Sequence, residues 1–379
     1  MKVFHKPIRL LLTLCLLAQL LLIPSFAADA PVYLALGDSI STGYGLSETD
    51  PGFVEQLADC YPDFTLVNEA VNGNTPAGVY EQLKDGALDS YLTSAKLITL
   101  TCGGNDMMGS LYEKIANLYN EKHPSAPIEP SDVVNIFAGR HPTLGMMDLL
   151  VEAMKAINGF SQSAEFEARL QEFTTALSQV MAYIREKNPS AEVVVATQYN
   201  PYTDFNGAGM YGRIYTEVEA GAIKLNDEIK ALAEPLGYTY ADVYTAFHNS
   251  SETLCNAKMT DNGPDLDFHP NAAGHTLIKD VILDLNLIPS FGINETKSSL
   301  ADGTVAVSLT AVDAPVNVVA AFYNRDNRMI GSDMVTLTES NLQTTLSAKF
   351  LGTAFRVQVF LLSDSSFIPL HQALNWSGN

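Results

Sequence analysis

The segment VYLALGDSIST at residues 32–42 begins with an apolar run and then presents Gly37, Asp38 and Ser39. A short, continuous apolar run of this kind is typical of a parallel strand that is covered on both faces. In open α/β sheets, ligands bind at the carboxyl ends of the strands. The segment therefore predicts a buried strand whose end places Ser39 at one edge of a sheet.

Four further apolar runs have the same character, and helical patterns alternate with them. These runs lie at residues 64–68, 97–101, 192–197 and 238–243. Between Phe166 and Ile184, apolar residues recur at steps of three and four, which is typical of a helix with one buried face. The alternation predicts a three-layer α/β/α fold around a five-stranded parallel sheet.

The length of 379 residues favours two domains. We expect the α/β domain to span residues 28–290. About 90 residues separate its third and fourth strand runs, where one helix and short loops would suffice, so we interpret about 107–160 as an insertion. Residues 300–379 change to short alternating runs separated by turns, which predicts a small all-β sandwich.

Residues 1–27 have the pattern of a secretory signal peptide: a basic start, an apolar run and a segment of small residues. The apolar run is shorter than the roughly 20 residues that a membrane-spanning helix needs. No later segment approaches that length of apolar sequence. We therefore expect a secreted or cell-surface protein without a transmembrane segment after cleavage.

The charge balance restricts the partners. The formal net charge is -21 at pH 7, and such a surface repels phosphate backbones, so a nucleic-acid partner is not expected. The sequence has no H-E-x-x-H motif and no cysteine pair at zinc spacing, and we expect neither a metal nor another cofactor. Cys60, Cys102 and Cys255 allow one disulfide at most, and whether two of them pair stays open.

Four chemically useful residues follow the predicted strands or precede the last predicted helix: Ser39, Gly73, Asn105 and His269. A serine hydroxyl becomes a good nucleophile when a base removes its proton, and histidine suits that task near neutral pH. Backbone N–H groups of Ser39 and Gly73, with the amide of Asn105, are candidate donors for an oxyanion. The pattern favours acyl transfer.

Four sequence blocks carry a resemblance to a known family. They are ALGDSISTGYG (35–45), VNGNT (71–75), GGND (103–106) and HPNAAGH (269–275). In this order they resemble the four blocks of the SGNH hydrolases, the GDSL lipase/esterase family, and the likeness spans residues 31 to about 285. The sequence has no G-x-S-x-G elbow, which argues against the α/β-hydrolase fold.

The resemblance implies a secreted serine ester hydrolase that acts through an acyl-enzyme. Ser39 resembles the nucleophile and, with Gly73 and Asn105, an oxyanion donor, while His269 resembles the general base. The family's substrates include acyl lipids and acetylated carbohydrates, and the sequence does not decide between these ester classes.

One position departs from the family pattern. The family usually has an aspartate three residues before the histidine, to orient and stabilise the imidazolium, but this position is Leu266 here. We expect Asp267 to take that role, with Asp265 or a backbone carbonyl near Leu266 as the alternatives. We expect His275 to be packed in its helix.

A second hypothesis comes from the same departure and from the appended β domain. The chain could be an SGNH-fold binding or surface protein with weak or no catalysis. The C-terminal segment resembles small β domains that are appended to secreted and surface proteins of Gram-positive anaerobes. That resemblance suggests a contact with the cell surface or with glycans through this domain.

Overall fold

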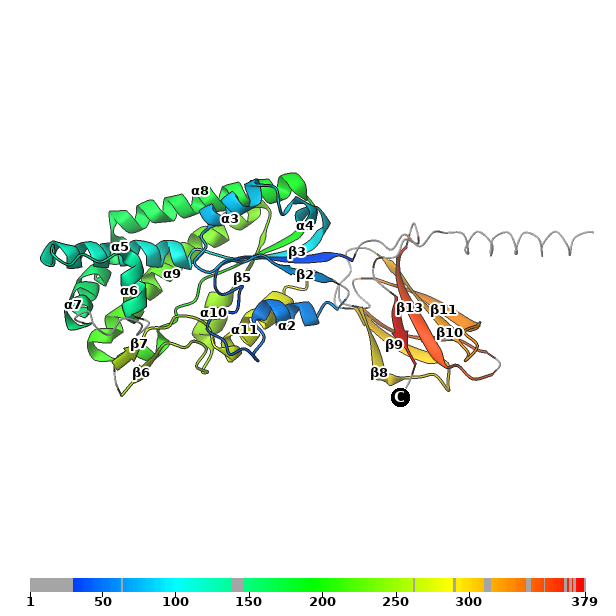
Figure 1. Cartoon of the computed structure of the whole chain (residues 1–379). Coiled ribbons are helices and arrows are strands. Elements are labelled where there is room, and N and C mark those ends of the chain that lie inside the picture. Colours follow the sequence, from blue (N-terminus) through cyan, green and yellow to red (C-terminus); the bar gives the residue numbers. More distant parts are fainter. Residues whose placement is uncertain are drawn as a thin grey trace, which may run out of the picture.

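The computed structural model describes residues 30–377 except 63, 138–145, 262, 289–290, 310–314, 339–341, 351, 365–366, 368–369 and 371–372. The predicted signal peptide, residues 1–27, lies outside the described residues. An α/β unit is followed along the chain by an all-β unit (Figure 1).

A five-stranded parallel sheet forms the centre of the α/β unit, in the order β2-β1-β3-β4-β5. The strands are β1 (Val32–Gly37), β2 (Thr65–Asn68), β3 (Ala95–Thr101), β4 (Glu192–Ala196) and β5 (Thr239–Ala241). Each overlaps one of the five apolar runs, so the predicted parallel sheet is confirmed.

Alternate side chains of β1 enter two different cores, because successive side chains of a strand point to opposite faces. Leu34 and Leu36 pack with α3 (Pro76–Lys84), α8 (Ala164–Lys187) and α9 (Gly212–Leu236). Tyr33 and Ala35 pack with α2 (Phe53–Asp59), α10 (Val243–Asn249) and α11 (Ala272–Leu283). Figure 1 shows these two helix groups on opposite faces of the sheet, which gives the three predicted layers.

Short helices and helical turns connect strands of this unit. Helix α4 (Asp89–Ser94) leads into β3, and the turns η2 (Thr203–Phe205) and η3 (Gly209–Tyr211) follow β4. The side-chain amide of Asn188, directly after α8, donates to the carbonyls of Leu92 and Ala95, both at 2.8 Å. These bonds tie the end of α8 to the beginning of β3.

The predicted insertion is helical. It contains α5 (Gly104–Lys122), α6 (Pro130–Phe137), α7 (Met146–Ile157) and η1 (Phe160–Gln162). Helix α5 already begins at Gly104, so the helical excursion starts inside the GGND block and not at residue 107. The buried carboxylate of Glu152 on α7 forms ion pairs with Lys122 of α5 and with Lys155 of α7 itself, and the pair with Lys122 holds α7 against α5.

The all-β unit is the predicted sandwich. One sheet contains β8 (Phe291–Ser299), β9 (Thr304–Leu309) and β12 (Gln343–Ser347). The other contains β10 (Val316–Tyr323), β11 (Met329–Leu337), β13 (Arg356–Ser363) and β14 (Leu374–Trp376). Side chains from both sheets share one apolar core.

The boundary of this unit differs from the prediction. Residues 291–299, which the prediction left outside the sandwich, form β8 and pair antiparallel with β9. The unit therefore begins at Phe291 and not at residue 300. Phe291 is itself part of the shared core, which explains why these residues join the sandwich.

Cys60, Cys102 and Cys255 are free thiols, so these three cysteines form no disulfide. Among the described helices, none combines the length and the apolar character that crossing a membrane requires.

The cores of the α/β unit contain no described residue beyond Ile288. We therefore predict that a chain ending after Ile288 folds by itself and unfolds in one cooperative thermal transition. Circular dichroism melting of the purified fragment tests this. A fragment that is soluble but lacks a transition would show that the β-sandwich stabilises the α/β unit.

His275 gives the fold a defined pH dependence. It is fully buried in α11, and its Nδ1 accepts a hydrogen bond from the backbone N–H of Phe53 at 3.2 Å. Burial, together with the charge of His269, lowers the pKa of His275 to about 4. A proton on Nδ1 would face that N–H, so the folded state holds the ring neutral.

We predict that this histidine destabilises the fold as pH falls. Above about 6.5 the ring is neutral in both states, but between 6.5 and about 4 only the unfolded chain binds the proton. The free energy of unfolding falls by about 3 kcal/mol for a pKa shift of this size, and the decrease levels off below pH 4. Urea unfolding of wild type and His275→Asn should show this difference.

Plotting the free energy of unfolding against pH for wild type and for His275→Asn isolates the contribution of His275. Asp106, whose pKa burial raises to about 7, contributes an opposite slope that is the same in both proteins. The same dependence of unfolding free energy on pH in the two proteins would contradict the prediction.

Candidate active site

The end of β1 is shaped by Gly37. Its φ of +119° is one that side-chain-bearing residues rarely adopt, and a Cβ atom there would lie 2.2 Å from the carbonyl oxygen of Thr101 on β3. Only glycine therefore allows the chain to turn here in contact with β3.

Asp38 holds this turn. Its Oδ1 accepts hydrogen bonds from the backbone N–H of Ile40 at 3.0 Å and from the Thr101 hydroxyl at 2.7 Å. Burial raises the pKa of Asp38, while these two bonds act against the rise. Both bonds lie inside the fold, so this aspartate builds the turn that presents Ser39.

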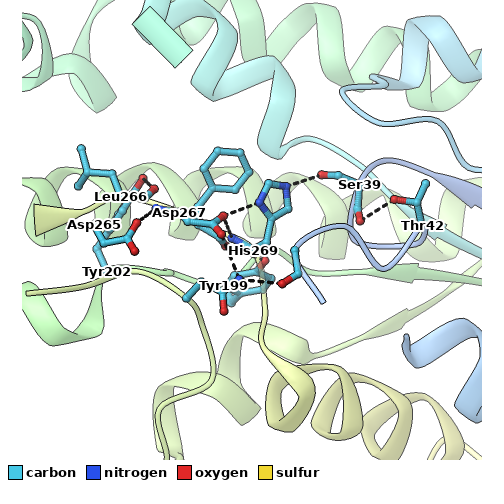
Figure 2. A network of polar contacts seen from close by, with 11 residues as sticks. Ser39, Thr42, Tyr199, Tyr202, Asp265, Leu266, Asp267 and His269 are labelled. Atoms are coloured by element: carbon cyan, nitrogen blue, oxygen red, sulfur yellow. Dashed lines mark hydrogen bonds and ion pairs between the residues drawn. The ribbon is translucent and has the colours of Figure 1, made fainter. Parts of the chain in front are cut away.

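Ser39, His269 and Asp267 form a connected polar chain (Figure 2). His269 Nε2 lies 3.0 Å from Ser39 Oγ, and His269 Nδ1 lies 2.6 Å from Asp267 Oδ1. Ser39 follows β1 and His269 precedes α11, so the sheet brings together residues that are 230 positions apart.

Asp267 reaches the imidazole through a local turn. Its Oδ1 also accepts the backbone N–H of His269 at 3.2 Å, which is the side-chain-to-backbone bond of an Asx turn. Its Oδ2 accepts from the Asn256 amide at 3.1 Å. Burial acts to raise the pKa of Asp267, but the bonds from His269 and Asn256 hold it below the usual range. The carboxylate is therefore ionised beside the imidazole.

The two alternative supports for His269 have other partners. Asp265, at the end of the β6–β7 hairpin (Lys258–Thr260 and Gly263–Asp265), accepts the backbone N–H of Asp267 at 3.2 Å. The carbonyl of Leu266 accepts the Tyr202 hydroxyl at 3.3 Å. Figure 2 shows both residues behind Asp267 as seen from the imidazole. They position the loop and do not hydrogen-bond the ring.

The candidate oxyanion donors share one cleft with Ser39 and His269. The Asn105 amide lies in the first turn of α5 and donates to the carbonyl of Asn74 at 2.9 Å, which fixes its orientation. Gly73 has a φ of +78° and open space where a Cβ would be. Within the described part of the chain, no acceptor binds the backbone N–H of Ser39 or Gly73.

Aromatic rings restrict the imidazole. The ring centroids of Tyr44 and Phe268 lie 4.7 Å and 4.4 Å from that of His269. The Tyr199 hydroxyl in turn donates to the Phe268 carbonyl at 3.2 Å. Sequence patterns do not reveal Tyr199, Tyr202 or Asn256, because each acts through contacts with another segment of the chain and none belongs to a recognisable motif.

One protein-family model matches most of the α/β unit. The model of the GDSL-like Lipase/Acylhydrolase family matches residues 35–277, which include all four blocks. The chain belongs to this family. The expected family resemblance is thereby confirmed.

Curated relatives of this GDSL-family chain include an uncharacterized protein, YpmR, of Bacillus subtilis (strain 168). It is 22% identical over 260 residues, which cover 65% of this chain and 78% of YpmR. The spore germination lipase LipC of Bacillus licheniformis is 33% identical over 89 residues, or 22% of this chain and 42% of LipC.

Solved structures with a similar trace include an extracellular lipase of Streptomyces rimosus. It is 20% identical with a TM-score of 0.45, and the match covers 67% of this chain and 99% of that one. Phospholipase A1 of Streptomyces albidoflavus NA297 is 24% identical with a TM-score of 0.43, over 67% of this chain and 99% of that one.

An apolar pocket opens beside Ser39 and Asn105 in this GDSL-family chain, and we call it the first pocket. It lies between the insertion, α8 and α9, and its empty space, counted together with the open solvent at its mouth, is about 830 Å³. Its apolar lining includes Met107, Leu111, Ile157, Phe160, Phe166 and Leu225.

Two carboxylates line the first pocket, that of Asp38 and that of Glu217, which lies on α9. The carboxylate of Glu217 accepts the Gly159 N–H at 2.9 Å and the Ser161 hydroxyl at 3.1 Å. These bonds fasten the end of the insertion to α9, so the pocket is closed by a fixed segment. Among the described residues, no group of three or more His, Cys, Asp or Glu side chains is arranged to hold a metal ion.

We predict that Asp267→Asn lowers kcat toward a p-nitrophenyl ester by up to about 10⁴-fold, the loss measured for the matching change in a serine protease. The amide keeps the size of the side chain but removes the charge that stabilises imidazolium. Steady-state kinetics should show KM little changed.

Asp265→Asn is the matched control for this change, because Asp265 bonds only the neighbouring loop backbone in the described contacts. We expect a loss of about tenfold or less, since a neutral acceptor still orders the loop. A large loss at Asp265 with a small one at Asp267 would reverse the assignment.

Proposed function

We propose that the chain hydrolyses carboxylic esters through a covalent acyl-enzyme on Ser39. The observation that carries the proposal is the 3.0 Å contact between His269 Nε2 and Ser39 Oγ, continued by the 2.6 Å contact to the ionised Asp267. A nucleophile, a base and a third group that orients the base are the arrangement that activates a serine hydroxyl.

In the first half of the reaction, Ser39 Oγ attacks the ester carbonyl while His269 Nε2 accepts the hydroxyl proton. Asp267 stabilises the imidazolium that forms. The backbone N–H groups of Ser39 and Gly73 and the amide of Asn105 stabilise the oxyanion. Collapse of the tetrahedral intermediate breaks the bond to the alcohol oxygen, which leaves with the proton from His269.

In the second half, His269 removes a proton from water, and the resulting hydroxide attacks the acyl-Ser39 carbonyl. The tetrahedral intermediate then releases the carboxylic acid, and Ser39 Oγ regains its proton from His269. One ester and one water give one acid and one alcohol, with no cofactor in the balance.

We place acyl lipids ahead of acetylated carbohydrates as substrates. The first pocket begins at Ser39 and Asn105, next to the position of the scissile carbonyl, and most of the residues that line it beyond this point are apolar. Burial of each methylene group of an acyl chain is worth about 0.8 kcal/mol. An acetyl group would leave this pocket empty, whereas a longer chain would fill it.

We also propose that the protein is secreted and that the β-sandwich, from Phe291 on, serves as an accessory unit that contacts the cell surface or glycans. The N-terminal pattern and the separate apolar core of the sandwich support this proposal.

Covalent labelling tests the catalytic proposal against the alternative of an inactive binding protein. A fluorophosphonate probe should label wild type at Ser39, and Ser39→Ala should remove the label. Peptide mass spectrometry locates the adduct. Wild type labelled no more than Ser39→Ala would favour the binding protein.

A chain-length series tests the substrate class. We predict that kcat/KM rises by at least about tenfold from p-nitrophenyl acetate to the octanoate, because the added methylene groups enter the first pocket. A maximum at the acetate would instead favour acetylated carbohydrates.

A further inference from the structure

A second apolar pocket lies next to the first one, between α5, α7 and α9, and we call it the second pocket. Its empty space, counted together with the open solvent at its mouth, is about 490 Å³. Its lining includes Leu111, Ile115, Ala153, Met154, Ile214 and Val218. Of the described residues that line it, none is charged. Such a pocket suits an apolar ligand.

The second pocket adjoins the cleft and shares lining residues with it. Met108, Tyr112 and Leu266 line both the second pocket and the cleft that holds Ser39 and His269. Met108 also lines the first pocket, so the cleft and both pockets meet at this flexible, unbranched side chain. Both pockets therefore adjoin the cleft at Met108, and we refer to them as two branches.

The two branches differ in their relation to the chemistry. Ser39 and Asn105 line the first pocket but not the second. A chain in the first pocket can thus belong to the acyl group that is transferred to Ser39. A chain in the second pocket belongs to another part of the same substrate.

The insertion builds the second pocket. Ala153, Met154 and Ile157 come from α7, and the buried Glu152 beside them fixes this helix to α5 through its ion pair with Lys122. The second branch is therefore a rigid part of the fold at the end of β3, above the catalytic edge of the sheet.

We infer that the substrate is a diacyl lipid. The scissile acyl chain occupies the first pocket, the second acyl chain occupies the second pocket, and the alcohol backbone with its head group lies in the cleft. The cleft has polar residues that line neither pocket, among them Asn72, Glu113 and Ser131. This inference rests on the proposed ester hydrolysis, which consumes one water and releases one fatty acid and one monoacyl product.

The experiment compares two substrates that share one acyl chain, dioctanoylglycerol and monooctanoylglycerol, in the same detergent micelles. Each buried methylene of the second chain contributes about fourfold to binding. Wild type should therefore hydrolyse the diacyl substrate with a kcat/KM at least about tenfold above that of the monoacyl substrate.

Two alanines offer a matched pair of variants. Ala153 lines only the second pocket and Ala222 lines only the first, and both are 8% exposed. Ala153→Phe should lower the ratio of diacyl to monoacyl kcat/KM by more than about tenfold, since the ring fills the second branch. Ala222→Phe should lower both rates and leave the ratio closer to that of wild type.

Thermal melts check that both variants fold, and Ala153→Leu, with a smaller added side chain, replaces Ala153→Phe if the ring prevents folding. An unchanged ratio in a folded Ala153 variant would overturn the inference. Monopalmitoylglycerol serves as a third substrate: if Ala153→Phe lowered only the hydrolysis of this ester, the second pocket would be an extension for one long chain, and the inference would be overturned. A wild type that hydrolyses none of these esters would instead refute the proposed function.

Discussion

The contact between the end of β1 and Thr101 of β3 is the constraint on which the site depends. Gly37 approaches the Thr101 backbone so closely that no side chain fits, and Asp38 then bonds the Thr101 hydroxyl. The buried parallel sheet thus sets the position of the turn, and the turn sets the position of Ser39. Because the neighbouring strand ends in the same place, Asn105 in the following helix reaches the same cleft.

The electrostatics of the site follow from burial combined with selective pairing. Asp38 and Asp267 are both carboxylates near one imidazole, but burial raises the pKa of the first, while hydrogen bonds from His269 and Asn256 lower that of the second. Two histidines six residues apart have different surroundings. His275 is sealed in the core and kept neutral, while His269 lies at the cleft between a hydroxyl and a carboxylate.

The insertion after β3 links the fold to specificity. It begins with the helix that carries Asn105 and continues into α7, whose side chains line both apolar pockets or the second one alone. The carboxylate of Glu217 and the ion pairs of Glu152 fasten this segment at two places. In the proposed function, substrate selection therefore belongs to this fastened addition, while the proposed chemistry takes place at the sheet edge.

The sequence by itself determined the five strands, the helix over 166–184, the sandwich and the family, because hydrophobic periodicity and motif order are local properties of the chain. It left open which group faces His269, since a spacing of two residues does not reveal the Asx turn that bends Asp267 back to the ring. It also placed the start of the sandwich too late, because β8 is recognised as a strand only through its pairing with β9. The two pockets were decided by tertiary structure alone: their walls come from helices far apart in the chain, and a cavity exists only where packing leaves space.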